Sequence, residues 1–177
     1  MAKGHQVETQ NTAHFLHDYG SEQADLRRLY EQAKIDQWNA ATDIDWSVPL
    51  EGDGGLISDD LVDIHGTRFW DAMSEADRVE LNRRVTRWRL STLVAGEHGA
   101  MLLCSQLVNN VQGQDAKLFQ ATQVADEARH NEVLQRYLEL RLDGESYGLG
   151  GNVKEIFDTL ETMAGGCAAI PDGDDDE

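Results

Sequence analysis

The sequence predicts an all-α fold, and two long stretches with helical spacing of apolar residues carry this prediction. Residues 114–142 contain neither glycine nor proline, and their apolar side chains recur at intervals of three and four residues. Residues 75–111 show the same spacing and follow Ser74, a residue type that caps helix N-termini. A short polar turn separates the two stretches, so we expect an antiparallel helical hairpin.

Three shorter features precede the hairpin. A first amphipathic helix is expected over residues 22–41, with Ser21 as its cap and leucine, tyrosine and tryptophan side chains along one side. Residues 43–66 include Pro49 and a glycine-rich run, which predict an extended loop with one short turn. A short helix over residues 67–73 then leads into the hairpin.

The two ends of the chain lack the pattern of a packed core. Residues 1–20 show little periodicity, and we expect an irregular N-terminal arm. Residues 143–177 begin with a glycine-rich sequence, contain one short amphipathic segment and end in an acidic run, which predicts a short helix and a flexible acidic tail. The sequence therefore predicts one helical domain, residues 21–142, between an arm and a tail.

The composition excludes two classes of partner. The formal net charge is −18, from 33 acidic and 15 basic side chains, so no nucleic acid is expected to bind. No apolar run reaches membrane-spanning length, and the N-terminal sequence lacks the apolar core of a signal peptide. We therefore expect a cytoplasmic protein that does not associate with a membrane.

The main chemical signal is the sequence D-E-A-R-H at residues 126–130. Glu127 and His130 are one helical turn apart, so a carboxylate oxygen and an imidazole nitrogen can reach one cation. Asp126 is close enough in sequence to accept from the second imidazole N–H while it pairs with Arg129, an outer shell that would fix the ring. The alternative is that both ligand types flank the apolar stripe and lie in water.

A second carboxylate, Glu97, raises the weight of the metal interpretation. It lies four residues from both Leu93 and Met101, on the apolar side of the helix predicted over residues 75–111. Burial of an unpaired carboxylate is costly, so this one should be protonated, paired or bound to metal. Glu97 and Glu127 lie at similar distances from the predicted turn, and an antiparallel hairpin brings them level. His98 points about 100° away from Glu97 and is not expected in the site.

The order of these residues, a lone Glu followed by D-E-x-R-H, resembles the first half of the ferritin-like di-iron carboxylate proteins. The stretches GEHGAMLLCSQL and KLFQATQVADEARHNEVLQRYL are most similar to the oxygenase members described as aminobenzoate-oxygenase-like. The resemblance covers residues 22–142. It implies a ferritin-like helical bundle in which this chain supplies a half-bundle, a long helical hairpin with an N-terminal helix.

The resemblance also implies the site and its metal. Glu97, Glu127 and His130 correspond to metal ligands, and Asp126 and Arg129 lie behind them. The expected cofactor is two iron ions per site, and manganese or a mixed manganese–iron pair would suit similar ligands.

One chain supplies only part of the ligand set of this family. Such sites use four carboxylates and two histidines, and residues 143–177 carry no second Glu and Glu-x-x-His of the required kind. Either a second chain completes the bundle, or the metal chemistry has been lost. Our first expectation is a homodimer with the metal site at its interface, and the rival is a heterodimer with a chain that supplies the other half.

The function expected from the resemblance is that of a non-haem di-iron oxidoreductase. It would activate dioxygen to oxidise a small organic substrate. A ferroxidase or iron-binding protein without an organic substrate is the second hypothesis. The third is a non-catalytic structural partner of a split di-iron enzyme.

Overall fold

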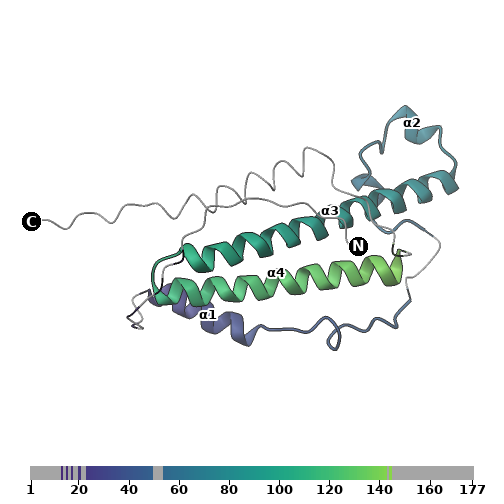
Figure 1. The fold of residues 1–177 in the computed structure, drawn as a ribbon. Helices are drawn as coiled ribbons and strands as arrows, with labels where there is room; N and C mark the ends of the chain where they lie inside the picture. The colour runs from purple at the N-terminus through teal and green to yellow at the C-terminus, as the bar shows by residue number, and fades with distance from the viewer. Residues whose placement is uncertain are drawn as a thin grey trace, which may run out of the picture. The chain divides into compact units, whose positions relative to one another are not determined.

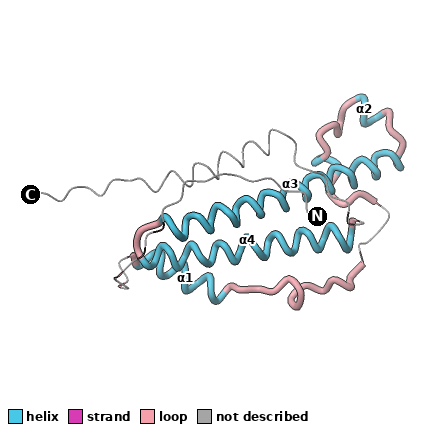
Figure 2. The backbone as a smooth tube through the Cα atoms, viewed as in Figure 1, coloured by secondary structure: helices cyan, strands magenta, loops and turns pink. Residues whose placement is uncertain are grey.

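A computed structural model describes residues 13, 15, 17, 20, 23–49, 54–142 and 144 of the 177 residues. These residues form helices and loops, with no β-strand among them (Figures 1 and 2). The all-α prediction is therefore confirmed. The elements are α1 (Ala24–Ile35), the 3₁₀-helix η1 (Asp59–Leu61), α2 (Arg68–Asp71), α3 (Glu75–Asn110) and α4 (Gln114–Arg141).

The two long helices begin and end close to their predicted limits. At the start of α3, the Ser74 hydroxyl accepts from the Asp77 backbone N–H at 3.2 Å and donates to the Asp77 carboxylate at 2.7 Å. Between α3 and α4, Gly113 takes a φ of 87°, a left-handed conformation that favours glycine. The Lys117 ammonium donates to the carbonyls of Val108 at 2.8 Å and Asn109 at 3.0 Å, which satisfies acceptors at the end of α3.

Helix α1 is shorter than predicted: it ends at Ile35, whereas the sequence predicted an end near residue 41. Polar side chains beyond this point bond to the backbone and compete with further helical turns. The Gln37 amide donates to the Ala33 carbonyl at 2.5 Å, and the Asp43 carboxylate accepts from the Asn39 N–H at 2.8 Å. The predicted cap, Ser21, lies outside the described residues.

The chain divides into two compact units, and the division falls inside both long helices. In the described residues, unit 1 consists of α1 with the residues up to Trp38, α3 from Gly96 onward, and α4 as far as His130. Unit 2 consists of Asn39–Ala95 and α4 from Asn131 onward. The predicted arm and tail lie outside the described residues, apart from a few single positions.

The buried apolar side chains of the described residues all lie in unit 2: Ala40, Val62, Trp70, Leu138 and Leu142. The loop before η1 is fastened to α3 there by Asn82, whose side chain is fully buried. Its carboxamide oxygen accepts from the Leu56 N–H at 2.8 Å, and its nitrogen donates to the Ile57 carbonyl at 2.7 Å. A Cβ at Gly55 would lie 2.5 Å from Asn82 Cγ, so this close approach requires glycine.

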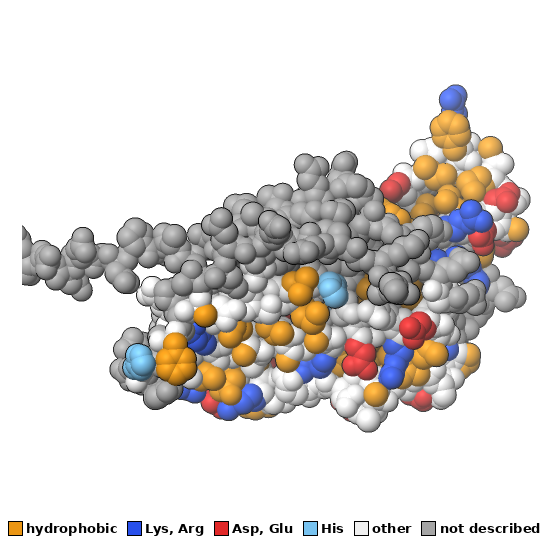
Figure 3. Space-filling view, in the orientation of Figure 1, with side chains coloured by type: hydrophobic (Ala, Val, Ile, Leu, Met, Phe, Trp, Pro, Cys, Tyr) orange, Lys and Arg blue, Asp and Glu red, His pale blue; other side chains and the backbone are white. Residues whose placement is uncertain are grey.

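In unit 1, an ion pair with a buried carboxylate joins α1 to α4, and the buried residues described there are polar rather than apolar. The Arg27 guanidinium of α1 lies 2.8 Å from the Asp115 carboxylate of α4, which also accepts from the Gln23 N–H at 3.1 Å. The buried residues described in this unit are polar, Asn110 and Asp115, and its apolar side chains keep part of their surface exposed. Apolar side chains accordingly appear among the charged ones on the molecular surface (Figure 3).

No helix within the described part of the chain combines the length and apolarity needed to cross a lipid bilayer.

Candidate metal centre

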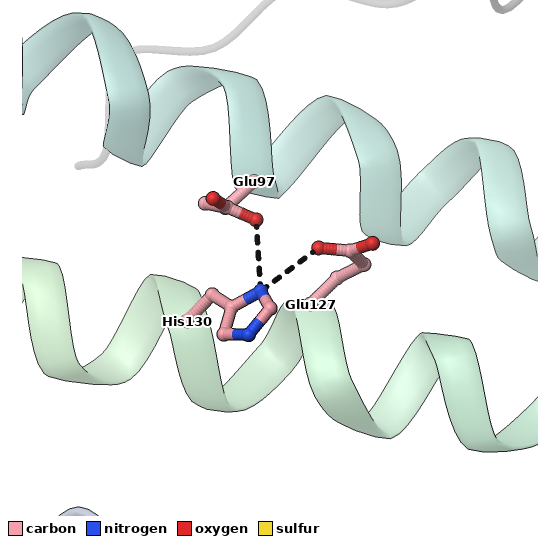
Figure 4. Close-up of side chains that lie close together, drawn as sticks. All are labelled: Glu97, Glu127 and His130. Atoms are coloured by element: carbon pink, nitrogen blue, oxygen red, sulfur yellow. Dashed lines mark hydrogen bonds and ion pairs between the residues drawn. The ribbon is translucent and has the colours of Figure 1, made fainter. Parts of the chain in front are cut away.

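Three of the predicted site residues meet in unit 1 (Figure 4). Glu97 projects from α3, and Glu127 and His130 project from α4. The Nδ1 atom of His130 lies 3.3 Å from Glu97 Oε2 and 3.2 Å from Glu127 Oε2. One ligand atom from each residue can be chosen so that all three lie within 4.8 Å of one another. The pattern on which the sequence prediction depended is thus present in three dimensions.

The local sequence explains why these groups converge. Glu127 and His130 are one turn apart on α4 and therefore share a helix face. Glu97 lies as far before the end of α3 at Asn110 as Glu127 lies after the start of α4 at Gln114. Because the connecting turn is short, the two carboxylates come to the same level of the hairpin.

The electrostatics of the site favour a cation. Burial raises the pKa of the Glu127 carboxyl, the hydrogen bond with Glu97 raises it further, and the hydrogen bond with His130 opposes both. Two carboxylates this close repel each other when both are ionised, and a cation between them removes that repulsion. The Glu97 side chain is 23% exposed and the Glu127 side chain is 20% exposed, so water screens the repulsion between them only in part. Oxygen and imidazole nitrogen donors of this kind fit iron or manganese.

Asp126 lies next to the site but does not contact His130. One of its oxygens pairs with Arg129, as predicted, and the other accepts from the Gln123 amide at 3.4 Å. Among the described residues no hydrogen bond joins Asp126 to the imidazole. The second ring nitrogen of His130 points away from both glutamates (Figure 4). The predicted contact between Asp126 and this nitrogen is therefore absent in the described part of the chain.

The structure adds Gln37 and Trp38, which the sequence prediction did not place in the site. The Trp38 ring stacks on the His130 ring, with centroids 6.4 Å apart and planes inclined by 27°. The Arg129 guanidinium lies 5.4 Å from the Trp38 ring centroid and donates to the Gln37 side-chain oxygen. Sequence spacing assigned Trp38 to the apolar side of the first helix, and α1 ends before it. Only knowledge of where α1 ends could have revealed this contact.

His98, which the helical wheel excluded, is exposed and takes no part in the cluster.

A family model described as p-aminobenzoate N-oxygenase AurF matches residues 20–168. The chain belongs to this family. The AurF family consists of ferritin-like di-iron oxygenases, so the resemblance found in the sequence is confirmed. The match extends beyond residue 142, the last residue of the resemblance described above. Searches of curated proteins and of solved structures found no match.

Membership in the AurF family and the geometry of unit 1 support each other. The family predicts a di-iron oxygenase, and the described residues contain one group of three side chains able to hold a metal ion, Glu97, Glu127 and His130. An exposed acidic cluster alone would carry little weight. A histidine between two half-buried carboxylates, in a chain of this family, is much stronger support for a metal site.

Proposed function

We propose that this protein is a non-haem di-iron oxygenase that uses dioxygen to oxidise a small organic substrate, with Glu97, Glu127 and His130 as metal ligands. The observation that carries the proposal is the convergence of three ligand atoms within 4.8 Å in an AurF-family chain. The family's description names an aminobenzoate N-oxygenase, so aromatic amines are the first substrates to test.

The chain's own residues have separate tasks in this proposal. Glu97 and Glu127 provide negative charge from two different helices, so a bound cation also ties α3 to α4 within unit 1. His130 presents Nδ1 to the same space as both carboxylates. When bound, a diferrous pair would supply two of the four electrons that reduce dioxygen, and the oxidised organic substrate would supply the other two. Manganese or a mixed pair suits the same donors, and iron is our first choice because of the family.

We also propose that a second copy of this chain completes the site. A di-iron centre of this type uses four carboxylates and two histidines, and two copies of the described cluster supply that set. The partly exposed apolar side chains of unit 1 also favour a covering partner, because Leu102 is 44% and Ile35 75% exposed. The rival is a heterodimer with a different chain that supplies the remaining donors.

Anaerobic loading with ferrous iron followed by exposure to oxygen tests the function. We expect about one iron per chain, and transfer of an ¹⁸O atom from labelled dioxygen to aminobenzoate, detected by mass spectrometry. Many irons mineralised per chain would instead favour iron storage. A purified protein that binds no iron, alone or with its natural partners, would favour a structural role.

A further inference from the structure

Trp38 is the aromatic side chain that covers His130. It lies just beyond the C-terminal end of α1, and its indole ring stacks on the imidazole with centroids 6.4 Å apart. This separation and the inclination of 27° are those of an offset stacked pair. The two side chains come from distant parts of the sequence, and both belong to unit 1.

Arg129 fixes the position of the indole ring. Its guanidinium lies 5.4 Å from the Trp38 ring centroid, donates to the side chain of Gln37 and pairs with Asp126. Gln37 in turn donates to the Ala33 carbonyl at the end of α1. Cation–π and charge-assisted contacts therefore attach the segment after α1 to the turn of α4 that carries His130.

In the described part of the chain, no protein group is hydrogen-bonded to the second ring nitrogen of His130. A metal-binding histidine ordinarily donates its second ring N–H to a carboxylate, a carbonyl or water. Here Nδ1 faces Glu97 and Glu127. The side chain is also 46% exposed, so packing on all sides does not restrain the ring.

We infer that Trp38 is a positioning residue for His130, whose ring it restrains by an aromatic contact where no described protein group bonds the second nitrogen. The indole restricts rotation of the imidazole so that Nδ1 stays directed at the two carboxylates, and Arg129 holds the indole in place. This inference rests on the proposed metal centre, because its consequence is tighter binding of metal by a ring that is already oriented.

Two substitutions separate the aromatic contact from simple filling of space. Trp38→Leu keeps apolar volume but removes the ring, and we expect ferrous iron to bind the full-length protein about three- to tenfold more weakly under anaerobic conditions. Trp38→Phe keeps a stacked ring, and we expect iron affinity within about twofold of wild type. Chelator competition measures each dissociation constant.

Two spectroscopic measurements report on the contact itself. In iron-free protein, Trp38→Leu should shift the NMR signals of the His130 ring, because the ring current of the indole is lost. In wild type, ferrous iron bound at His130 should quench fluorescence from Trp38. The Trp38→Phe variant should lose most of that quenching although it still binds iron.

Trp46 provides a matched control. Its ring lies 5.7 Å from the Arg136 guanidinium, an arrangement similar to that of Trp38 and Arg129, but in unit 2 and without a ring contact to a histidine in the described residues. Trp46→Leu should leave iron affinity and the His130 signals unchanged.

The possible results are distinguishable. A folded Trp38→Leu protein with wild-type iron affinity overturns the positioning role alone. If Trp38→Leu does not fold, quenching that persists in Trp38→Phe overturns it, and quenching that disappears supports it. A wild-type protein that takes up no ferrous iron, alone or with its natural partners, overturns both this inference and the proposed function.

Discussion

The two glutamates of the site oppose each other in the absence of metal. Burial and the neighbouring Glu97 both raise the pKa of Glu127, which means that a second negative charge there is unfavourable in the iron-free protein. A group arranged for binding at the expense of stability is a frequent feature of functional sites. Removal of the charge should therefore have opposite effects on metal binding and on stability.

The substitution Glu127→Gln tests this opposition. We expect it to abolish stoichiometric iron binding, because an amide is a poor replacement for a carboxylate ligand. The melting temperature of the iron-free protein should stay the same or rise by roughly 1–4 °C, since like-charge repulsion is removed. Metal analysis and thermal unfolding by circular dichroism measure the two effects. Glu132→Gln, at an exposed position of α4, is the control and should change neither.

Asp126 acts on the site through Arg129, according to its contacts. Asp126→Asn removes the charge that balances the guanidinium, which should loosen the contacts of Arg129 with Gln37 and Trp38. We expect iron affinity to fall about tenfold without loss of stoichiometry, measured by chelator competition. Gln123→Ala removes only the neutral partner of Asp126 and should change affinity less than twofold. Equal affinities for Asp126→Asn and wild type would show that Asp126 has no part in the site.

At the scale of whole elements, the attachment of α1 determines whether Trp38 can reach the site. Asp115, at the start of α4, holds Arg27 and the Gln23 N–H of the α1 region. The Asp115 side chain is 1% exposed and that of Arg27 is 34% exposed, so the carboxylate end of the pair lies away from water. The ion pair of Lys34 and Glu31 on α1 is much more exposed, because these two side chains are 46% and 52% exposed.

We therefore expect Asp115→Ala to lower the free energy of unfolding by about 2–4 kcal/mol, because a partly buried guanidinium and a backbone N–H lose their partner. Lys34→Ala should cost less than about 1 kcal/mol, as is usual for exposed pairs. Urea denaturation followed by circular dichroism measures both. Similar losses in the two variants would mean that Asp115 does not anchor α1.

The elements also show what the sequence could predict. Long periodic segments specify their own register, so the limits of α3 and α4, and with them the convergence of Glu97 with Glu127 and His130, could be predicted. The end of α1 could not, because side-chain bonds such as that of Gln37 to the Ala33 carbonyl decide it locally. The contact of Trp38 with His130 depends on where α1 ends, so the spacing of residues in the sequence could not predict this contact.

At the scale of the whole molecule, charge sets a condition on the proposed homodimer. Each chain carries a net charge of −18, so two copies repel each other at low ionic strength. Two clusters of Glu97, Glu127 and His130 at one interface would add a local concentration of carboxylates to this repulsion. A pair of divalent cations would compensate the four carboxylates, and metal binding should therefore favour association.

The resulting prediction is that iron and dimerisation are linked. Light scattering combined with metal analysis should show a dimer with about one iron per chain, and removal of iron by a chelator should shift the protein toward monomer at low salt. Glu127→Gln, which cannot complete the site, should show a monomer–dimer equilibrium that no longer responds to iron. Added salt should strengthen association of the iron-free chain by screening its charge, whereas it should matter less once iron is bound. An iron-free monomer that gains iron only with a different polypeptide would replace the symmetric site with one shared between two unlike chains.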